Sequence, residues 1–328
     1  MQVCVAAMTS RVLKALGAVA ATLAATLPLP LLAQEDGRYA FTQDYDPAPA
    51  MWELSDEDTT IYMLGTIHLL PEGFRWRNPQ LDTIIEEADV LVVETSDADS
   101  EGAVESISPK IVRVLANRQP TSAQLSPQSR PRWRQLVAMS GLPFEYVDNV
   151  PVMVALLGFG QAGLAGDPSS YDHGVETVLQ REFTERGKPI ESIEDFGRVM
   201  YSLFRTDDEA VVSELDVQLR QWGGKTLDGL YSAETQALVG NDYWAMEHAW
   251  ARGEVAEEFD LGFGGGKIGD AFNEVLLDRR NAQWAAWLEN RLEQPGTVLL
   301  AVGAGHFEGP ESVLAYLEGR GLRARRIN

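Results

Sequence analysis

Short runs of consecutive apolar residues mark both ends of the chain as strand-forming. Residues 61–66 form one run with β-branched members, residues 90–93 form a second that ends at Glu94, and residues 297–303 form a third. Runs of this length without alternating polar positions are typical of strands that are buried on both faces of a sheet. The pattern therefore predicts three buried strands, with a carboxylate directly after the second.

Helical patterns follow the first and third of these runs. Asn78 before Pro79 is typical of a helix N-cap followed by proline at the first helical position, and apolar residues then recur at helical spacing. Residues 310–320 show the same spacing, and residues 321–327 indicate a closing edge strand. Strand, helix and strand in succession predict a βαβ unit, whose two strands run parallel.

The middle of the chain is predicted to be mainly helical. Residues 131–140, 150–157 and 174–186 have helical patterns, whereas residues 188–194 indicate a short strand that ends in acidic residues. Residues 199–293 are compatible with helix and rich in tryptophan, which we expect to pack the helices together.

The fold class predicted from this order is α/β (α+β). We expect a mixed, partly parallel sheet, formed by the N- and C-terminal βαβ units, with a large helical insertion or cap. The expected domain covers residues 52–328, with its core in 52–97 and 296–328 and the insertion over roughly 198–295, after an extended lead-in over residues 34–51.

The most hydrophobic tract lies at the start of the chain. Arg11 and Lys14 precede an uncharged, Ala- and Leu-rich stretch over residues 15–32, which ends at the small residue Ala33. This order is typical of a secretory signal peptide over residues 1–33, although a tract of this length approaches that of a membrane anchor. The prolines near its end favour cleavage, so we expect an exported, periplasmic or extracellular protein with no stable membrane span.

The composition excludes some partners and some kinds of site. The 328 residues include 27 Lys and Arg against 49 Asp and Glu, a net charge of −22, which disfavours binding to nucleic acid. Loss of the leader would remove Arg11, Lys14 and the single cysteine, Cys4, and would change the charge to −24. A metal ion would then have to be held by histidine and carboxylate.

Two histidines occupy equivalent places at strand ends. His68 ends the segment Gly65-Thr66-Ile67-His68, and His306 ends Gly303-Ala304-Gly305-His306. Both Gly-x-x-His segments follow a predicted strand, and the carboxyl ends of parallel strands are where ligands and catalytic groups gather. We interpret the two histidines as a functional pair rather than as two structural turns. His248, within a helical run, is interpreted as structural.

Carboxylates follow two of the strands. Glu94 is 26 residues beyond His68, a spacing that fits one βαβ unit. Glu194 ends the later strand, and Glu191, on the same predicted strand, is the alternative carboxylate. Two imidazoles with one or two carboxylates are able to hold a divalent metal ion that activates water. They are equally able to act as an acid–base pair without metal, and the residues do not decide between these.

Two glycine-rich segments do not predict a nucleotide cofactor. Residues 158–163 match Gly-x-Gly-x-x-Gly but lack the following helix of a dinucleotide fold. Residues 262–269 resemble a phosphate loop only loosely and are interpreted as a flexible hinge or lid.

With these motifs, residues 52–327 resemble the TraB/GumN family, which includes the TIKI proteins. The resemblance rests on residues 64–70, Val92-Val93-Glu94, Gly174-Val175-Glu176, residues 187–190, Ile193-Glu194, Arg280-Asn281 and residues 302–309. The family usually has Asp where Glu176 stands and Leu-Glu-Thr where Ile193-Glu194-Asp195 stands.

The resemblance implies an α/β core related to erythromycin-esterase-like and ChaN-like proteins, and a metal-dependent protease activity like that of some TIKI members. His68, Glu94 and His306 would hold a divalent cation such as Mn, Co or Zn, Glu194 would act as general base, and Arg280 would stabilise the oxyanion. The expected substrate is a peptide or another small molecule with a peptide or ester carbonyl. The alternative is a noncatalytic accessory protein that binds envelope polysaccharide or a peptide signal.

Overall fold

The structure, a computed structural model, describes residues 37–99, 109–164, 166–206, 209–230, 238–259 and 261–328. The predicted signal peptide over residues 1–33 lies outside these ranges. Within them, no helix combines the length and the apolar character that crossing a membrane requires.

The described residues form a six-stranded sheet in the order β6-β4-β7-β2-β1-β8. Its strands are β1 (Met51–Ser55), β2 (Thr59–Thr66), β4 (Val90–Val93), β6 (Ile190–Ser192), β7 (Gly296–Gly303) and β8 (Arg325–Arg326). Strands β6, β4, β7 and β2 run parallel, whereas β1 is antiparallel to β2 and β8 is antiparallel to β1. This mixed, partly parallel sheet confirms the predicted fold class.

The two strands of the first βαβ unit are parallel, as predicted, but they are not neighbours. Strand β7 lies between β2 and β4 and pairs with both. Strand β1 was not predicted, because only five residues separate the proline-containing lead-in from the next turn. A separate two-stranded sheet joins β3 (Leu70–Pro71) to β5 (Ser169–Ser170).

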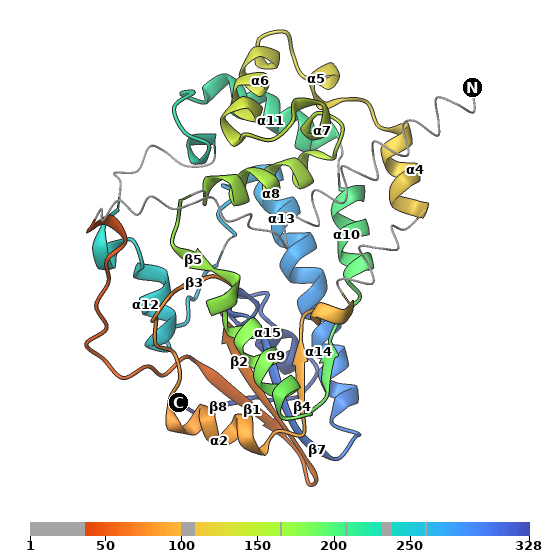
Figure 1. Ribbon diagram of the computed structural model, residues 1–328. Coiled ribbons are helices and arrows are strands. Elements are labelled where there is room, and N and C mark those ends of the chain that lie inside the picture. The colour runs from red at the N-terminus through yellow and green to blue at the C-terminus, as the bar shows by residue number, and fades with distance from the viewer. Residues whose placement is uncertain (1–36, 100–108, 165, 207–208, 231–237, 260) are drawn as a thin grey trace.

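Helices cover both faces of the main sheet (Figure 1). On one face, α2 (Pro79–Glu87) and α9 (Val175–Glu185) pack in one apolar cluster with Leu299 and Ala301 of β7. On the other face, α14 (Arg279–Arg291) and α15 (Val313–Gly319) pack with Leu300 and Val302. Successive residues of β7 thus point to opposite faces of the sheet. Residues 299–302 are all fully buried, which explains why the apolar run of β7 is uninterrupted.

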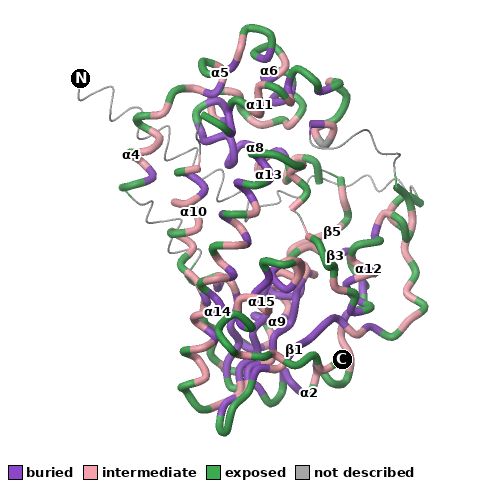
Figure 2. Tube along the Cα trace, turned by 180° about the vertical axis from the view of Figure 1, so that it is seen from behind, coloured by how far each residue is buried: buried purple, intermediate pink, exposed green. Residues whose placement is uncertain are grey.

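A second apolar core joins helices away from the sheet. Its helices include α4 (Pro109–Asn117), α6 (Ser129–Ser140), α7 (Phe144–Val147), α8 (Val152–Gly163), α10 (Phe196–Arg205), α11 (Glu209–Gln221) and α13 (Gly266–Asn273). The predicted packing role of tryptophan is confirmed here for Trp222, which is buried in this core, and in the sheet layer for Trp284. Figure 2 shows buried residues gathered both in the sheet and within this helical part.

The remaining helices are short or lie at the side of the sheet. They are α5 (Thr121–Gln124) and α12 (Ala245–Ala251), with 3-10 turns at Gly37–Tyr39, Tyr171–His173, Asp228–Leu230, Gly240–Asp242 and Ala304–Phe307. His248 lies in α12, where it is buried and its Nδ1 is 2.7 Å from the hydroxyl of Tyr45, as a histidine that packs a helix would be.

One helical rod connects the helical core to the sheet. Helix α13 continues through a π-helical turn, Glu274–Asp278, directly into α14. A π-helical turn widens the helix locally and shifts the faces on which the following side chains project. Arg280 and Asn281 come immediately after it, on the first turn of α14.

The two glycine-rich segments do not have the backbone arrangement that their sequence patterns would need to bind a nucleotide. Gly158 and Gly163 lie inside α8, which excludes a strand-to-helix turn there. At the start of α13, the carboxylate of Glu214 accepts a hydrogen bond from the backbone N–H of Lys267. An internal carboxylate thus occupies the helix N-terminus that a phosphate would need, and Gly266 makes room for it.

Candidate functional site

Three parallel strands bring His68, Glu94 and His306 together. His68 follows β2, Glu94 follows β4 and His306 follows β7, so all three lie at the carboxyl edge of the sheet. The Nε2 atoms of His68 and His306 are 4.0 and 3.7 Å from the same oxygen, Oε1 of Glu94. The structure therefore gathers these three predicted residues around one point.

The two Gly-x-x-His turns are in direct contact. A Cβ atom on Gly65 would lie only 3.0 Å from Cα of Ala304 in the other turn. Because a contact of that length is tighter than nine in ten real Cβ contacts, the absence of a side chain at residue 65 lets the two turns approach and brings their histidines together.

Gly303 forms the floor of the space between the three side chains. Its N–H donates to Oε1 of Glu94 at 2.9 Å. A Cβ atom on Gly303 would lie 3.1 Å from Oε1 of Glu94 and 3.7 Å from both Nε2 of His68 and Cδ2 of His306. A glycine at this position therefore keeps a small space free at the centre of the cluster.

Glu176 is a second carboxylate of the site, to which the sequence analysis assigned no role. It lies in the first turn of α9, and its Oε1 is 2.7 Å from Nδ1 of His68 and accepts a hydrogen bond from the hydroxyl of Thr66. Its other oxygen, Oε2, is buried without a hydrogen-bond partner among the described residues. The start of α9 comes this close because Gly174 contacts the backbone of His68, where a Cβ atom would lie 2.0 Å from the carbonyl oxygen.

Asn281 contacts Nδ1 of His306, as Glu176 contacts Nδ1 of His68. Its Oδ1 is 2.6 Å from Nδ1 of His306, and its Nδ2 donates to the backbone carbonyl of Glu311 at 2.7 Å. The second bond fixes which end of the amide faces the imidazole, so Nδ1 of His306 is the donor and Nε2 keeps its lone pair. From the sequence, Asn281 was predicted only as part of the segment Arg280-Asn281 that resembles the family, and its contact with His306 was not predicted.

Arg280 links Glu94 to Glu194. Its Nη2 contacts a carboxylate oxygen of each, at 2.7 Å for Glu194, and its Nε donates to Glu194 at 2.8 Å. Glu194 also accepts a hydrogen bond from Nε1 of Trp284 at 3.1 Å, and the Trp284 ring lies 4.2 Å from the His306 ring. Both carboxylate oxygens of Glu194 are thus engaged, whereas Glu191 is exposed on β6.

The electrostatic environment pushes the two histidines in opposite directions. The neighbouring charge of Glu176 raises the pKa of His68 to about 9, against the opposing effect of burial and with support from Glu94. Burial lowers the pKa of His306 to about 3. His306 is therefore uncharged at neutral pH, and His68 carries a proton when no cation is bound.

The carboxylates of the site also differ in charge preference. Burial pushes the pKa of Glu94 upward, but the charge of Arg280, the two nearby histidines and the N–H of Gly303 outweigh it and hold the pKa below its ordinary value. Burial raises the pKa of Glu194 despite its bonds to Arg280. The pKa of Arg280 is raised because its two carboxylate partners outweigh its burial.

The donor atoms suit a divalent cation but stand slightly too far apart to hold one in this arrangement. Within the described ranges, no three His, Cys, Asp or Glu side chains are close enough to form a metal site. Two ligand atoms on a tetrahedral zinc ion lie about 3.4 Å apart. The distances of 4.0 and 3.7 Å from the two histidines to Glu94 would each have to shorten by about half an ångström or less to reach that separation. Their chemistry, two neutral imidazole nitrogens and a carboxylate, is that of hydrolytic zinc sites.

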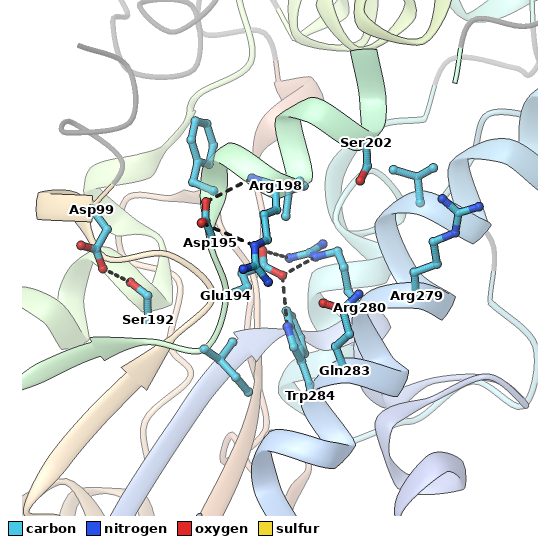
Figure 3. A pocket seen from close by; sticks show the side chains of 14 residues that line it. Asp99, Ser192, Glu194, Asp195, Arg198, Ser202, Arg279, Arg280, Gln283 and Trp284 are labelled. Carbon is cyan, nitrogen blue, oxygen red and sulfur yellow. Dashed lines mark hydrogen bonds and ion pairs between the residues drawn. The ribbon is translucent and has the colours of Figure 1, made fainter. Parts of the chain in front are cut away.

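A cavity of about 560 Å³ lies beside this cluster. It is lined by Glu194, Arg280 and Trp284, by the start of α10 and by the π-helical turn. Figure 3 shows Glu194 between Arg280 and the start of α10, with Trp284 below it. Arg280 and Trp284 line this cavity and also contact the cluster, Arg280 through Glu94 and Trp284 through His306.

Comparisons with known proteins identify a family for the chain and one relative. The family model described as "TraB/PrgY/gumN family" matches residues 50–326. An uncharacterized protein of Treponema pallidum (strain Nichols) is 22% identical over 278 residues, which cover 83% of this chain and 80% of the relative. No solved structure matches the chain.

Proposed function

The chain belongs to the TraB/PrgY/gumN family. We propose that it is a hydrolase whose reacting centre lies between His68, Glu94 and His306. The observation that carries the proposal is the convergence of two imidazole Nε2 atoms on one oxygen of Glu94, above the bare backbone of Gly303. The resemblance to TIKI-type proteases supports a peptide bond as the target, with an ester as the alternative.

The surrounding side chains hold this centre in place. Glu176 and Asn281 bind the Nδ1 atoms of the two histidines, so both Nε2 atoms are directed inward. Arg280 keeps Glu94 ionised, and Glu194 in turn holds Arg280. The side chain of His68 is 54% exposed and that of His306 only 5%, so substrate would enter on the His68 side, with His306 at the floor.

We propose that His68, Glu94 and His306 hold a divalent cation, Mn, Co or Zn. A cation there would lower the pKa of a water molecule toward neutrality and polarise the substrate carbonyl. The carboxylate–histidine contact at Glu176 supports this assignment, because histidines that bind metals usually give their second nitrogen to such a partner.

The geometry suits Glu194 to positioning rather than to proton transfer. Three hydrogen bonds from Arg280 and Trp284 occupy its two oxygens, which leaves it poorly placed to take a proton from water. The oxyanion role expected of Arg280 requires one of its carboxylate contacts to open during the reaction, because those contacts use its Nε and Nη2 groups.

The test is hydrolysis of a peptide library and of ester substrates by the purified protein, before and after treatment with a chelator. We expect activity that the chelator abolishes and that Mn, Co or Zn restores. His68→Ala, His306→Ala and Glu94→Gln should each lose at least about 100-fold in kcat/KM. Glu191→Gln is the matched control, since Glu191 is an exposed carboxylate on the same sheet, and it should retain full activity.

Other outcomes separate the alternatives. Activity that survives the chelator but is lost in both histidine variants would replace the metal by acid–base chemistry. No hydrolysis with any substrate, together with binding of polysaccharide or peptide that the three variants leave unchanged, would overturn the hydrolase and favour an accessory role.

We also propose that the protein works outside the cytoplasm. The basic residues and apolar tract before Ala33 support export. N-terminal sequencing of the protein recovered from a periplasmic fraction should begin near Gln34, and recovery of the full-length chain in the cytoplasm would contradict export.

A further inference from the structure

The cavity beside the cluster has the size of a small-molecule site. Its volume of about 560 Å³ falls within the range of roughly 300–1,000 Å³ that is usual for ligand pockets. Apolar surface from Phe196, Val199, Val275 and Trp284 contributes part of its lining, and charged and polar side chains contribute the rest.

The acidic side chains of the cavity already have partners. Glu194 accepts hydrogen bonds from Arg280 and Trp284. Asp195 caps α10 by accepting from the backbone N–H of Arg198, and Asp99 accepts from the hydroxyl of Ser192 at 2.5 Å. Each of these carboxylates therefore already accepts a hydrogen bond from a neighbouring group.

The side chains of the cavity that donate hydrogen bonds have fewer partners than its carboxylates do. The guanidinium of Arg198 makes only a 3.7 Å ion pair with Asp195, which is longer than a hydrogen bond. Nη2 of Arg279 forms an ion pair with Glu274. Within the described residues, its Nε and Nη1 have no hydrogen-bond partner. The hydroxyl of Ser202 and the amide of Gln283 likewise have none there.

These free donors come from two different walls. Arg198 and Ser202 belong to α10, whereas Arg279 and Gln283 belong to α14 (Figure 3). In that view Arg280 lies between Arg198 and Arg279. A ligand in the cavity would therefore meet guanidinium groups on both sides, in a protein whose net charge is otherwise strongly negative.

We infer that this cavity binds an oxyanion-bearing group of the substrate, a carboxylate or a phosphate, through Arg198 and Arg279. Guanidinium groups offer paired N–H donors that match the oxygens of both anions. Ser202 and Gln283 add neutral donors. The inference rests on the proposed hydrolase and assigns its substrate class, because the cavity and the reacting centre share the side chains of Arg280 and Trp284.

Direct binding tests the anion site without relying on catalysis. Inorganic phosphate and glutarate are titrated separately into the purified protein and followed by calorimetry. The site predicts saturable binding of at least one of them, and the stronger ligand identifies phosphate or carboxylate as the recognised group. The double variant Arg198→Gln/Arg279→Gln should weaken that binding at least tenfold.

Arg325→Gln is the matched control, because Arg325 is an exposed arginine that pairs with Glu53 on the far edge of the sheet. It should bind the anion as the unchanged protein does. No saturable binding, or equal weakening in the control, would overturn the inference, and circular dichroism and the melting temperature would show whether the double variant remains folded.

Kinetics then test the connection to the reacting centre. With a peptide that carries an acidic side chain or with a phosphorylated peptide, the double variant should raise KM at least tenfold and leave kcat within about twofold. With the neutral counterpart it should change neither constant. Equal effects on both peptides would overturn the substrate assignment, while hydrolysis itself would still support the proposed function.

Discussion

At the residue scale, the candidate site depends on one position without a side chain. Gly303 has its hydrogen where a Cβ atom would face Glu94, His68 and His306. The residues that form this centre were predictable from sequence, since each lies within three residues of the end of an apolar run that is typical of a buried strand.

Gly303→Ala should remove function while preserving the fold. The methyl group would fill the space between the three side chains, so we expect at least about 100-fold lower kcat/KM and weaker metal binding. The melting temperature should fall by no more than about 4 °C, because only a few tenths of an ångström of adjustment are needed at Glu94. Calorimetric titration with Mn, Co and Zn measures the binding.

Gly160→Ala serves as the control for this substitution. Gly160 lies in α8, and a Cβ atom there would contact nothing within 4 Å. It should leave metal binding and activity unchanged. A fully active Gly303→Ala protein would show that the reacting centre lies elsewhere.

The two histidines should titrate far apart in the metal-free protein. We expect His68 to titrate near pH 9 and His306 to remain neutral down to about pH 4, as measured by NMR of the imidazole resonances. Glu176→Gln should move the pKa of His68 back toward its ordinary value of about 6.5, because the neighbouring charge of Glu176 is the main cause of the shift.

Because His68 binds its proton more tightly in the folded protein, the unfolding free energy depends on pH. The folded protein holds the His68 proton more tightly than the unfolded chain, so this contribution is complete below about pH 6.5 and is lost as the pH rises toward 9. The difference in unfolding free energy between the unchanged protein and Glu176→Gln should shrink over that interval. A constant difference would contradict the assigned contact.

Sequence reasoning missed the partners of the histidines for a physical reason. Glu176 and Asn281 reach the site from α9 and α14, and neither helix position reveals which strand end it faces. Glu194 was predicted as a base because it follows a strand, but its engagement by Arg280 and Trp284 depends on a helix that begins 85 residues later.

At the element scale, close backbone approaches decide how α9 meets the strand ends. The backbone of Gly174 contacts the carbonyl group of His68, and the N–H of Val175 donates to the carbonyl of Ile67 at 3.0 Å. These contacts fix the start of α9 and hence the position of Glu176.

Gly174→Ala should damage both stability and the site. Its Cβ atom would overlap a backbone oxygen that no rotamer change can move, so we expect a loss of about 2–3 kcal/mol in unfolding free energy by urea denaturation. The pKa of His68 should fall as Glu176 withdraws. Gly319→Ala, whose Cβ atom would meet nothing within 4 Å, should be neutral or slightly stabilising.

The helices and strands were largely predictable from the sequence, whereas the order of the strands in the sheet was not. The helix after Asn78 begins where its cap indicated, with the Asn78 side chain accepting from Leu81 N–H at 2.9 Å. Local periodicity contains no information on strand order, so the insertion of β7 between β2 and β4 could not be inferred from the apolar runs.

At the scale of the whole molecule, the excess of acidic residues should make stability depend on salt. A net charge of −22 produces self-repulsion in the compact state, and salt shortens the screening length from about 10 Å at 0.1 M to about 3 Å at 1 M. We therefore expect the melting temperature to rise between 0.02 and about 0.3 M NaCl, as measured by scanning fluorimetry.

A matched osmolality of an uncharged solute such as glucose is the control, and it should raise the melting temperature less than the salt does. A melting temperature that falls with salt would mean that ion pairs, such as those of Arg280, outweigh the general repulsion.

The place of β7 in the middle of the sheet also determines when the molecule can become functional. Residues 59–66 must pair with residues 296–303, which are synthesised long after them. Closing so large a loop costs chain entropy before the contacts compensate for it, which slows folding. A nascent chain that ends before residue 296 has β2 and β4 but not the strand that joins them, so neither the sheet nor the histidine pair can assemble until residues 296–306 have been synthesised.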